Sequence, residues 1–268
     1  MARLGIIACQ ILELELAYLL ANDTDVSGIT VLDNGFGDGF MRAVKKKGHV
    51  IPRLTGDIGK GQPTEAGQIE VVVQMMELGL HTVIKDLRSA VIGSVLEMST
   101  HVDAIVLGYG LCGNALNNHE EIMRDIDVPL FMPMDEDHTV DDCVGLIIGG
   151  REAYYEEQCK VAGTFFMNTG FSRHWKDLLH KANSLAFDEA MSRRLMASYE
   201  RSLLLTTPVL SEEEMAANIE EFNQTYGLRT EARKGTLEIL EKTLARGKRF
   251  VMEKTEGGHA VPEERAKI

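Results

Sequence analysis

Residues 4–20 read LGIIACQILELELAYLL, and this stretch carries the pattern on which the fold prediction rests. Its first part, Leu4–Ala8, is a short apolar run typical of a buried strand. After Cys9 the apolar residues recur at helical spacing, at Ile11, Leu12, Leu14, Leu16, Leu19 and Leu20. A strand that passes directly into a helix is the repeating unit of α/β proteins, so the stretch predicts that class.

Three more apolar runs follow in the first half of the chain, at Ile29–Leu32, Ala104–Leu107 and Leu130–Met132. Each is followed by turn-forming, glycine-rich or acidic residues. Strands that are apolar throughout and separated by helices are typical of parallel sheets buried on both faces. The pattern predicts an α/β protein with a mostly parallel, Rossmann-like sheet covered by helices.

Two helices are expected between the strands Ile29–Leu32 and Ala104–Leu107, at Glu65–Leu78 and Val83–Met98, because both segments carry apolar residues at helical spacing. The segment Thr55–Gly67 contains four glycines and Pro63, which predicts an exposed loop.

The second half predicts further elements: a helix from about Thr139 to Lys160, a strand at Thr164–Met167, a helix around Trp175, a strand near Leu203–Thr206, and helices at Ser211–Tyr226 and Thr236–Ala245. Ser211 stands three residues before Glu214, which is the spacing of a capping box. We expect a two-lobed protein, with an α/β domain that carries the cysteine site at residues 1–150. Residues 151–268 would form a second α/β lobe with a loose C-terminal tail.

The charge balance narrows the classes of partner. Lys and Arg total 28 against 41 Asp and Glu, which gives a net charge of −13. Such a surface repels nucleic-acid phosphates, and the basic run Lys45–Lys47 is expected to solvate a helix end. No apolar stretch approaches the length of a membrane helix, and the N-terminus lacks a signal-peptide pattern. We therefore expect a cytoplasmic protein, with no nucleic-acid or membrane partner and with reduced cysteines.

Three of the four cysteines are expected at strand ends and helix starts. Cys9 follows the first strand, Cys112 follows the third in a glycine-rich loop, and Cys143 follows two aspartates that would cap a helix. Ligands of open parallel sheets bind beyond the carboxyl ends of the strands, where these loops would meet. A helix N-terminus also lowers a thiol pKa and favours thiolate. The alternative is three small buried apolar side chains. Cys159, expected in mid-helix, is interpreted as incidental.

Two other residues are candidates for the substrate side of this site. His81 would act as a ligand or proton carrier, and Arg88, seven residues later and so on the same helix face, would hold an anionic group. The alternatives are surface duty for His81 and surface pairing of Arg88 with Asp86 or Glu97. The acidic loop from Asp135 to His138 is a weaker candidate. Neither glycine-rich segment, Gly35–Gly39 or Gly56–Gly61, has the spacing of a nucleotide-binding loop.

Several of these motifs resemble one uncharacterised family. They are Ile7-Ala8-Cys9, Leu80-His81-Thr82 with Leu87-Arg88, Tyr109-Gly110-Leu111-Cys112-Gly113, and Asp141-Asp142-Cys143 with Gly149-Gly150. Their order and spacing are similar to those of the domain-of-unknown-function family sixteen thirty-eight, over roughly residues 4–180. Its members, from methanogens and anaerobic bacteria, are often encoded beside corrinoid-dependent methyltransferases. The resemblance implies a role in anaerobic one-carbon metabolism. The sequence departs from the family pattern after Phe166, where Asn168-Thr169-Gly170 stands in place of a more apolar stretch.

The leading hypothesis is a metal-binding enzyme of anaerobic one-carbon or corrinoid-linked methyl metabolism, in which Cys9, Cys112 and Cys143 ligate Zn²⁺ or a [4Fe–4S] cluster. Tyr109, Gly110 and Gly113 would help to bind this cofactor. A small-molecule substrate and a corrinoid protein or methyltransferase are the expected partners. One alternative is a non-catalytic accessory protein that binds a corrinoid system or a small carboxylate. Another is nucleophilic catalysis by one thiol paired with His81 or His138, without metal.

Overall fold

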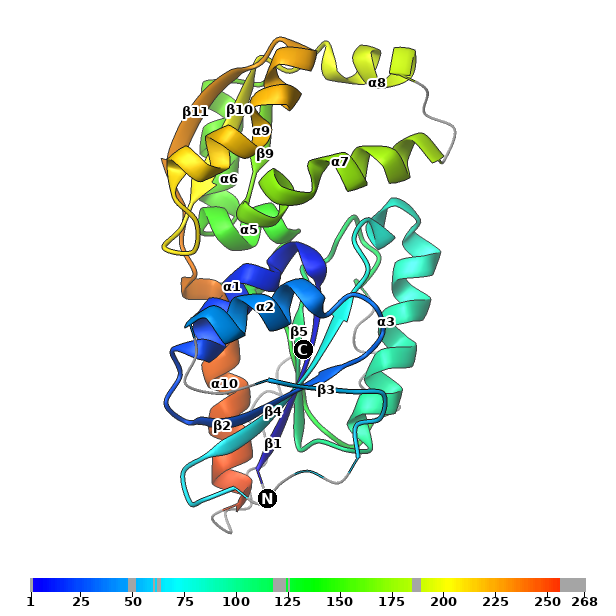
Figure 1. Ribbon diagram of the computed structural model, residues 1–268, viewed down its shortest axis with the longest axis vertical. Coiled ribbons are helices and arrows are strands. Elements are labelled where there is room, and N and C mark those ends of the chain that lie inside the picture. Colours follow the sequence, from blue (N-terminus) through cyan, green and yellow to red (C-terminus); the bar gives the residue numbers. More distant parts are fainter. Residues whose placement is uncertain are drawn as a thin grey trace.

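The protein has two lobes, each built around a parallel sheet (Figure 1). This computed structural model describes residues 2–47, 52–59, 61, 64–117, 124, 126–184 and 189–255. The predicted C-terminal tail, from residue 256 onward, lies outside the described residues.

A six-stranded sheet forms the first lobe, with the order β3-β2-β4-β1-β5-β6 and every neighbouring pair parallel. Its strands are β1 (Arg3–Cys9), β2 (Val26–Leu32), β3 (Arg53–Thr55), β4 (Ile69–Met76), β5 (Ala104–Gly108) and β6 (Leu130–Phe131). The helices around it are η1 (Gln10–Leu12), α1 (Glu13–Ala21), α2 (Asp38–Lys47), η2 (Leu80–Thr82) and α3 (Ile84–Ser99). The predicted Rossmann-like α/β fold is confirmed.

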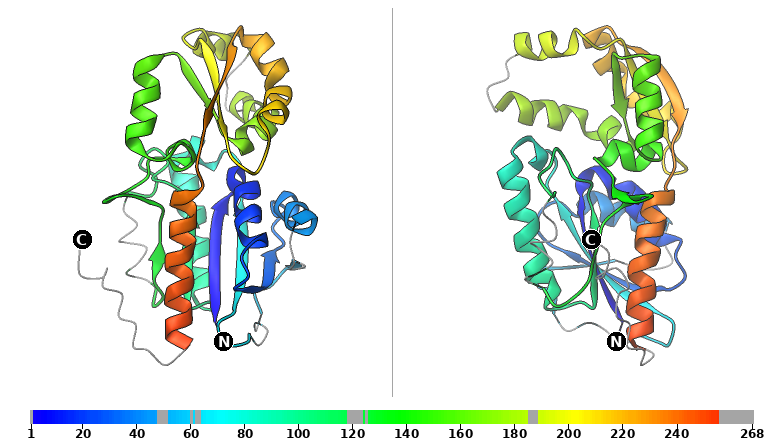
Figure 2. Two further views of the ribbon diagram at one scale, coloured as in Figure 1. Left: turned by 90° about the vertical axis from the view of Figure 1, so that its left-hand side faces the viewer. Right: turned by 180° about the vertical axis from the view of Figure 1, so that it is seen from behind.

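The two faces of this sheet are covered by different helices. Successive residues of β1 point to opposite faces, so Leu4 and Ile6 pack with α1, α2 and the C-terminal helix α10 (Glu238–Thr255). Ile7 packs on the other face with apolar residues of α3. Figure 2 shows α10 and α3 on opposite sides of the strands. Among the described helices, none combines the length and the apolar character needed to cross a bilayer.

One prediction in this lobe is wrong. Residues 69–76 form the strand β4, where a helix was expected over Glu65–Leu78. Ile69, Val72, Val73 and Met76 fit a helical spacing, but Val71 and Met75 between them are equally buried. Strand β4 pairs with β2 on one side and β1 on the other, so both of its faces are covered and its apolar run is continuous.

The second lobe contains a three-stranded parallel sheet, with the order β11-β10-β9. A small hairpin, β7 (Met134–Asp135) and β8 (His138–Thr139), precedes it where an acidic loop was expected. The strands of the three-stranded sheet are β9 (Thr164–Met167), β10 (Arg201–Thr206) and β11 (Arg229–Lys234). The helices are α5 (Cys143–Ile148), α6 (Arg151–Lys160), α7 (Thr169–Ser184), α8 (Glu189–Met196) and α9 (Glu212–Tyr226).

The helix expected from Thr139 to Lys160 is broken into α5 and α6. Gly149 and Gly150 separate them with φ angles of 99° and 101°, a region that side chains with a β-carbon rarely adopt. The capping box of α9 is confirmed, since the Glu214 backbone N–H donates to Ser211 Oγ and the Ser211 N–H donates to Glu214.

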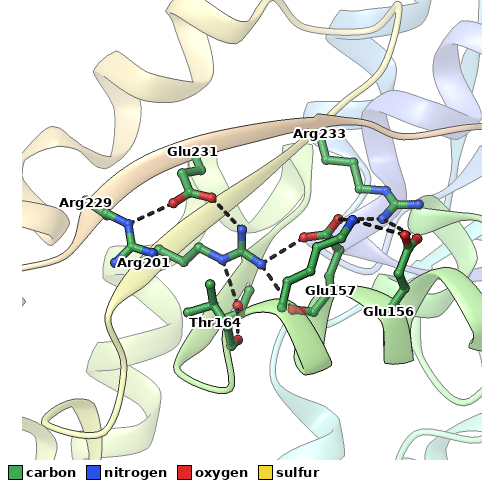
Figure 3. A network of polar contacts seen from close by, with 9 residues as sticks. Glu156, Glu157, Thr164, Arg201, Arg229, Glu231 and Arg233 are labelled. Atoms are coloured by element: carbon green, nitrogen blue, oxygen red, sulfur yellow. Dashed lines mark hydrogen bonds and ion pairs between the residues drawn. The ribbon is translucent and has the colours of Figure 1, made fainter.

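An ion-pair network joins α6 to the second sheet (Figure 3). The guanidinium of Arg201 donates to a carboxylate oxygen of Glu157 at 2.8 Å and to Thr164 Oγ1 at 2.8 Å, and it pairs with Glu231. Arg233 donates to Glu157 at 2.6 Å. Arg201 and Glu157 are both buried, so each charge depends on the other for compensation.

The C-terminal helix returns to the first lobe. The expected division assigns all of residues 151–268 to the second lobe, whereas Leu240, Leu244 and Val251 of α10 belong to the core of the six-stranded sheet. Gly247 lies so close that a β-carbon there would stand 2.8 Å from Val106 Cγ2. The second sheet is therefore inserted between two parts of the first lobe.

Candidate functional site

The carboxyl ends of β1 and β5 lie at the same edge of the first sheet, because the two strands are parallel neighbours. Cys9 is the last residue of β1, and β5 ends at Gly108, just before the loop that contains Cys112. The strand register sets where these two ends lie: Ala8, the residue before Cys9, pairs with Gly108, the last residue of β5. Cys9 and the loop of Cys112 therefore lie at the edge where α/β sheets bind their ligands.

Backbone hydrogen bonds hold the loop after β5 against the residues that precede α5. The N–H of Leu111 donates to Val140 O at 2.9 Å, and the N–H of Cys112 donates to Asp141 O at 2.7 Å. Cys112 has a φ of 48°, an uncommon conformation for a residue with a side chain. The loop is thus fixed in a strained shape that places Cys112 beside the start of α5.

Cys143 is the first residue of α5. The side chain of Asp142 caps this helix, since its Oδ1 accepts the N–H groups of Val144 and Gly145, both at 2.9 Å. This confirms the predicted capping role. Asp142 is largely enclosed, and burial raises the pKa of its carboxyl.

The pKa values of the three thiols are coupled to one another. Burial raises the pKa of Cys9 to about 11. Burial, followed by the charges of Cys9 and Asp142, raises that of Cys112 to about 12. The pKa of Cys143 is raised well above its ordinary value by burial, then by Asp142, Cys9 and Cys112. Each thiol is therefore within electrostatic reach of the others, and their use as one site stays a prediction.

The direction of these shifts is opposite to the expected one. A helix N-terminus was expected to favour thiolate, but burial outweighs that effect at all three positions, and the charge of Asp142 adds to it at Cys112 and Cys143. The shifts favour the neutral thiol over the thiolate at all three positions. Cys159 is exposed on α6, and its partner is Tyr155 of the same helix.

Tyr109 lies among the thiols. Its side chain is buried, and burial followed by the charges of Cys9 and Cys112 raises its pKa well above the ordinary value. The hydroxyl lies near the Cys9 thiol, and within the described residues it has no partner in hydrogen-bond geometry. A buried hydroxyl without a partner beside three thiols is a polar group available to whatever the cluster binds.

Helix α7 of the second lobe adds two groups that sequence reasoning did not identify. Asn168, just before the helix, acts to lower the pKa of Cys143, and the charge of Lys181 acts to lower that of Cys9. The ammonium of Lys181 donates to Leu78 O at 2.6 Å and pairs with Glu77. Neither residue lies in a motif, and only the packing of α7 on the first lobe brings them to the cluster.

His81 and Arg88 do not share one helix face as expected. The extended conformation of Val83, with φ −125° and ψ 101°, separates η2 from α3, so the two residues lie in different elements. His81 is exposed, yet its ring is covered enough for burial to lower its pKa, while the nearby Asp142 acts in the opposite direction. The groups that chiefly shift the thiol pKa values do not include Arg88, whose role in the site stays a prediction.

Gly110 and Gly113 serve the backbone of this loop. A β-carbon at Gly110 would stand 2.6 Å from Val140 O, whereas Gly113 has a φ of 66° and open space around it. His138 belongs to the β7–β8 hairpin and contacts its own neighbours, with Nδ1 2.9 Å from Asp137. Within the described part of the chain, no group of three or more His, Cys, Asp or Glu side chains is arranged to hold a metal ion.

Comparison with known proteins gives one match. The model of a family described as "Protein of unknown function (DUF1638)" matches residues 75–244. Neither the curated proteins nor the solved structures contain a significant match to the chain. The matched segment covers the loop of Cys112, the start of α5 at Cys143 and the α7 residues that reach the cluster.

Proposed function

The chain belongs to the DUF1638 family, and we propose that this member binds a metal centre, Zn²⁺ or an iron–sulfur cluster, through Cys9, Cys112 and Cys143. One observation carries the proposal: three thiols from separate segments lie within electrostatic reach of one another at the carboxyl edge of a parallel sheet. Thiolates are soft ligands, which favour zinc and iron–sulfur centres over magnesium and calcium.

The charges of the cluster support a cationic occupant. Each thiolate that forms raises the pKa of the other thiols, and Asp142 adds a further negative charge. A bound cation would replace this repulsion by attraction, so ionisation of the thiols and metal binding would occur together. Lys181 and Asn168 favour the ionised thiols from the side of the second lobe.

Three protein ligands leave one position of the metal centre for a substrate. Zinc would supply Lewis-acid chemistry there, and a cluster would supply redox or Lewis-acid chemistry. The surrounding residues would position the substrate: Tyr109 with its buried hydroxyl, and His81, which lies within electrostatic reach of Asp142. Because burial lowers the pKa of His81, the neutral imidazole is favoured at pH 7, and this form can accept a proton or act as a metal ligand.

The finer parts of the proposal rest on the sequence resemblance. They are a cytoplasmic role in anaerobic one-carbon metabolism and a corrinoid protein or methyltransferase as partner. A non-catalytic accessory role, holding such a partner or a small carboxylate, is the competing proposal. The two roles differ in metal content, because the accessory role needs no metal.

The test is anaerobic purification followed by elemental analysis and a visible spectrum. We expect about one zinc ion or one cluster per chain, since three thiolates and an open position form one centre. Cys112→Ser should remove most of the metal, and the matched variant Cys159→Ser should keep it, because Cys159 is exposed on α6. Equal metal content in the two variants, or a metal-free wild-type protein, would contradict the proposal.

A further inference from the structure

A cavity of about 460 Å³ lies where the two lobes meet. The first lobe contributes residues of α1 and α2, and the second lobe contributes residues of α7, the β10–α9 connection and α9. Figure 1 shows α1 and α2 at the end of the first lobe that faces the second. The cavity is lined by none of the cysteines of the metal-site proposal, so it is a separate feature.

Three cationic side chains line this cavity. Arg42 and Lys46 stand four residues apart on α2 and therefore share one helix face, and Arg173 comes from α7. Like charges at this spacing repel each other and slightly destabilise a helix. Arg42 lies in the middle of α2, so the helix dipole does not account for its charge. The concentration of cations is notable in a chain of net charge −13.

The protein compensates the charges of these three cations only in part. Neither Arg42 nor Lys46 has a hydrogen-bond or ion-pair partner among the described residues. Arg173 lies 3.5 Å from Glu13, but that carboxylate oxygen also contacts His174 Nε2 at 3.0 Å. Glu214, an acidic residue of the lining, is engaged in the capping box of α9. The cavity therefore offers positive charge to a ligand.

The rest of the lining is largely apolar, with Leu14, Val209 and Leu210 beside the ring of Tyr18. A ligand that satisfies both parts has a multiply charged anionic group and an organic body. The volume falls within the range of small-molecule sites. We propose that this cavity binds a small organic phosphate of about mononucleotide size, with the phosphate at Arg42, Lys46 and Arg173. Since both lobes line the cavity, the ligand would also hold them together.

Isothermal titration of the full-length protein at low salt tests this, with pyrophosphate, AMP and uncharged adenosine as probes. We expect pyrophosphate and AMP to bind and adenosine to bind at least tenfold more weakly, because the cations recognise the phosphate. The double variant Arg42→Ala/Lys46→Ala should weaken the binding of AMP at least tenfold. Saturating AMP should raise the melting temperature of wild-type protein, because it binds only the folded, two-lobed form.

The matched control is Lys45→Ala/Lys85→Ala, which removes the same charge from exposed helix positions outside the cavity. It should bind AMP like the wild type. Absence of binding by both phosphate probes would overturn the proposal. So would equal binding of adenosine and AMP, or equal losses in the two double variants, since these results would exclude recognition of phosphate by the cavity. All four substituted residues are exposed, so circular dichroism should show an unchanged fold.

Discussion

Gly110 lies against the backbone of Asp142, at a distance where a β-carbon on residue 110 would stand 2.7 Å from the Asp142 nitrogen. The loop that carries Cys112 and the helix that begins at Cys143 meet at this contact. Because residue 110 is a glycine, the two segments can approach closely, and Cys112 lies within electrostatic reach of Cys143.

Gly110→Ala should therefore destabilise the protein. The new methyl group meets backbone atoms of Val140 and Asp142, which cannot rotate away, so we expect a loss of about 1–3 kcal/mol in the free energy of unfolding. Gly93→Ala is the control, because Gly93 is exposed within α3 and has open space around it. That change should stabilise by about 0.5–1 kcal/mol. Urea denaturation measures both, and a neutral Gly110→Ala would contradict the packing described.

Asp142→Asn should make the thiols of the metal-free protein more reactive. Asparagine keeps the oxygen that caps α5 but removes the charge that raises the pKa of Cys112 and Cys143. Lower pKa values give more thiolate at a given pH and hence faster alkylation by iodoacetamide. Mass spectrometry of the labelled cysteines at pH 8 gives the rates. Exposed Cys159 is the internal reference, and an unchanged ratio to it would refute the coupling.

Glu15 should give the protein a pH-dependent stability. Burial raises its pKa to about 7, and within the described residues neither carboxyl oxygen has a hydrogen-bond partner. The unfolded chain loses this proton near pH 4.5 and the folded chain near pH 7, so stability falls as pH rises between these values. The loss amounts to about 3 kcal/mol.

Glu15→Gln should remove that loss, because glutamine does not titrate. Its free energy of unfolding relative to wild type should rise by about 3 kcal/mol between pH 5 and pH 8. Exposed Glu97→Gln on α3 should leave the pH profile unchanged. Parallel profiles for Glu15→Gln and wild type would show that Glu15 is ionised in the folded protein.

Arg201→Ala should be the most destabilising change among these. It leaves the buried carboxylate of Glu157 without one of its charged partners, and breaking a buried ion pair costs about 3–5 kcal/mol. Arg229→Ala breaks the exposed pair with Glu231 in the same network and should cost less than about 1 kcal/mol. Thermal denaturation of the two variants compares them directly, and similar costs would contradict the difference in burial.

The fold could be predicted from the sequence wherever apolar runs had clear ends. Leu4–Ala8, Ala104–Leu107 and Thr164–Met167 all lie in strands. The prediction failed at β4 because a strand covered on both faces is apolar at every position and contains a helical spacing by chance. Strand β11 was missed for the opposite reason: its sequence RTEARK is polar, and its pairing with β10 and the contacts of Glu231 and Arg233 hold it in place.

The candidate site could be predicted only in part, because the sequence shows where strands end but not how the loops pack. Placement at strand ends grouped the three cysteines, because parallel strands bring their carboxyl ends to one edge, and the role of this group as a site stays a prediction. The pKa values could not be predicted, since they depend on how fully the loops enclose the thiols. Lys181 could not be found either, because it reaches Cys9 only through the docking of α7 from a different lobe.

The return of α10 to the first sheet determines when this protein can finish folding during synthesis. Chains emerge from the ribosome N-terminus first, and domains generally fold as units. The strands β1 and β5 are made early, but α10, which covers them with Leu240, Leu244 and Val251, is translated only after the inserted lobe. The nascent sheet keeps an apolar face open while the whole inserted lobe is made. This face of the first sheet is therefore the part of the protein that would need the shielding of a chaperone for the longest time.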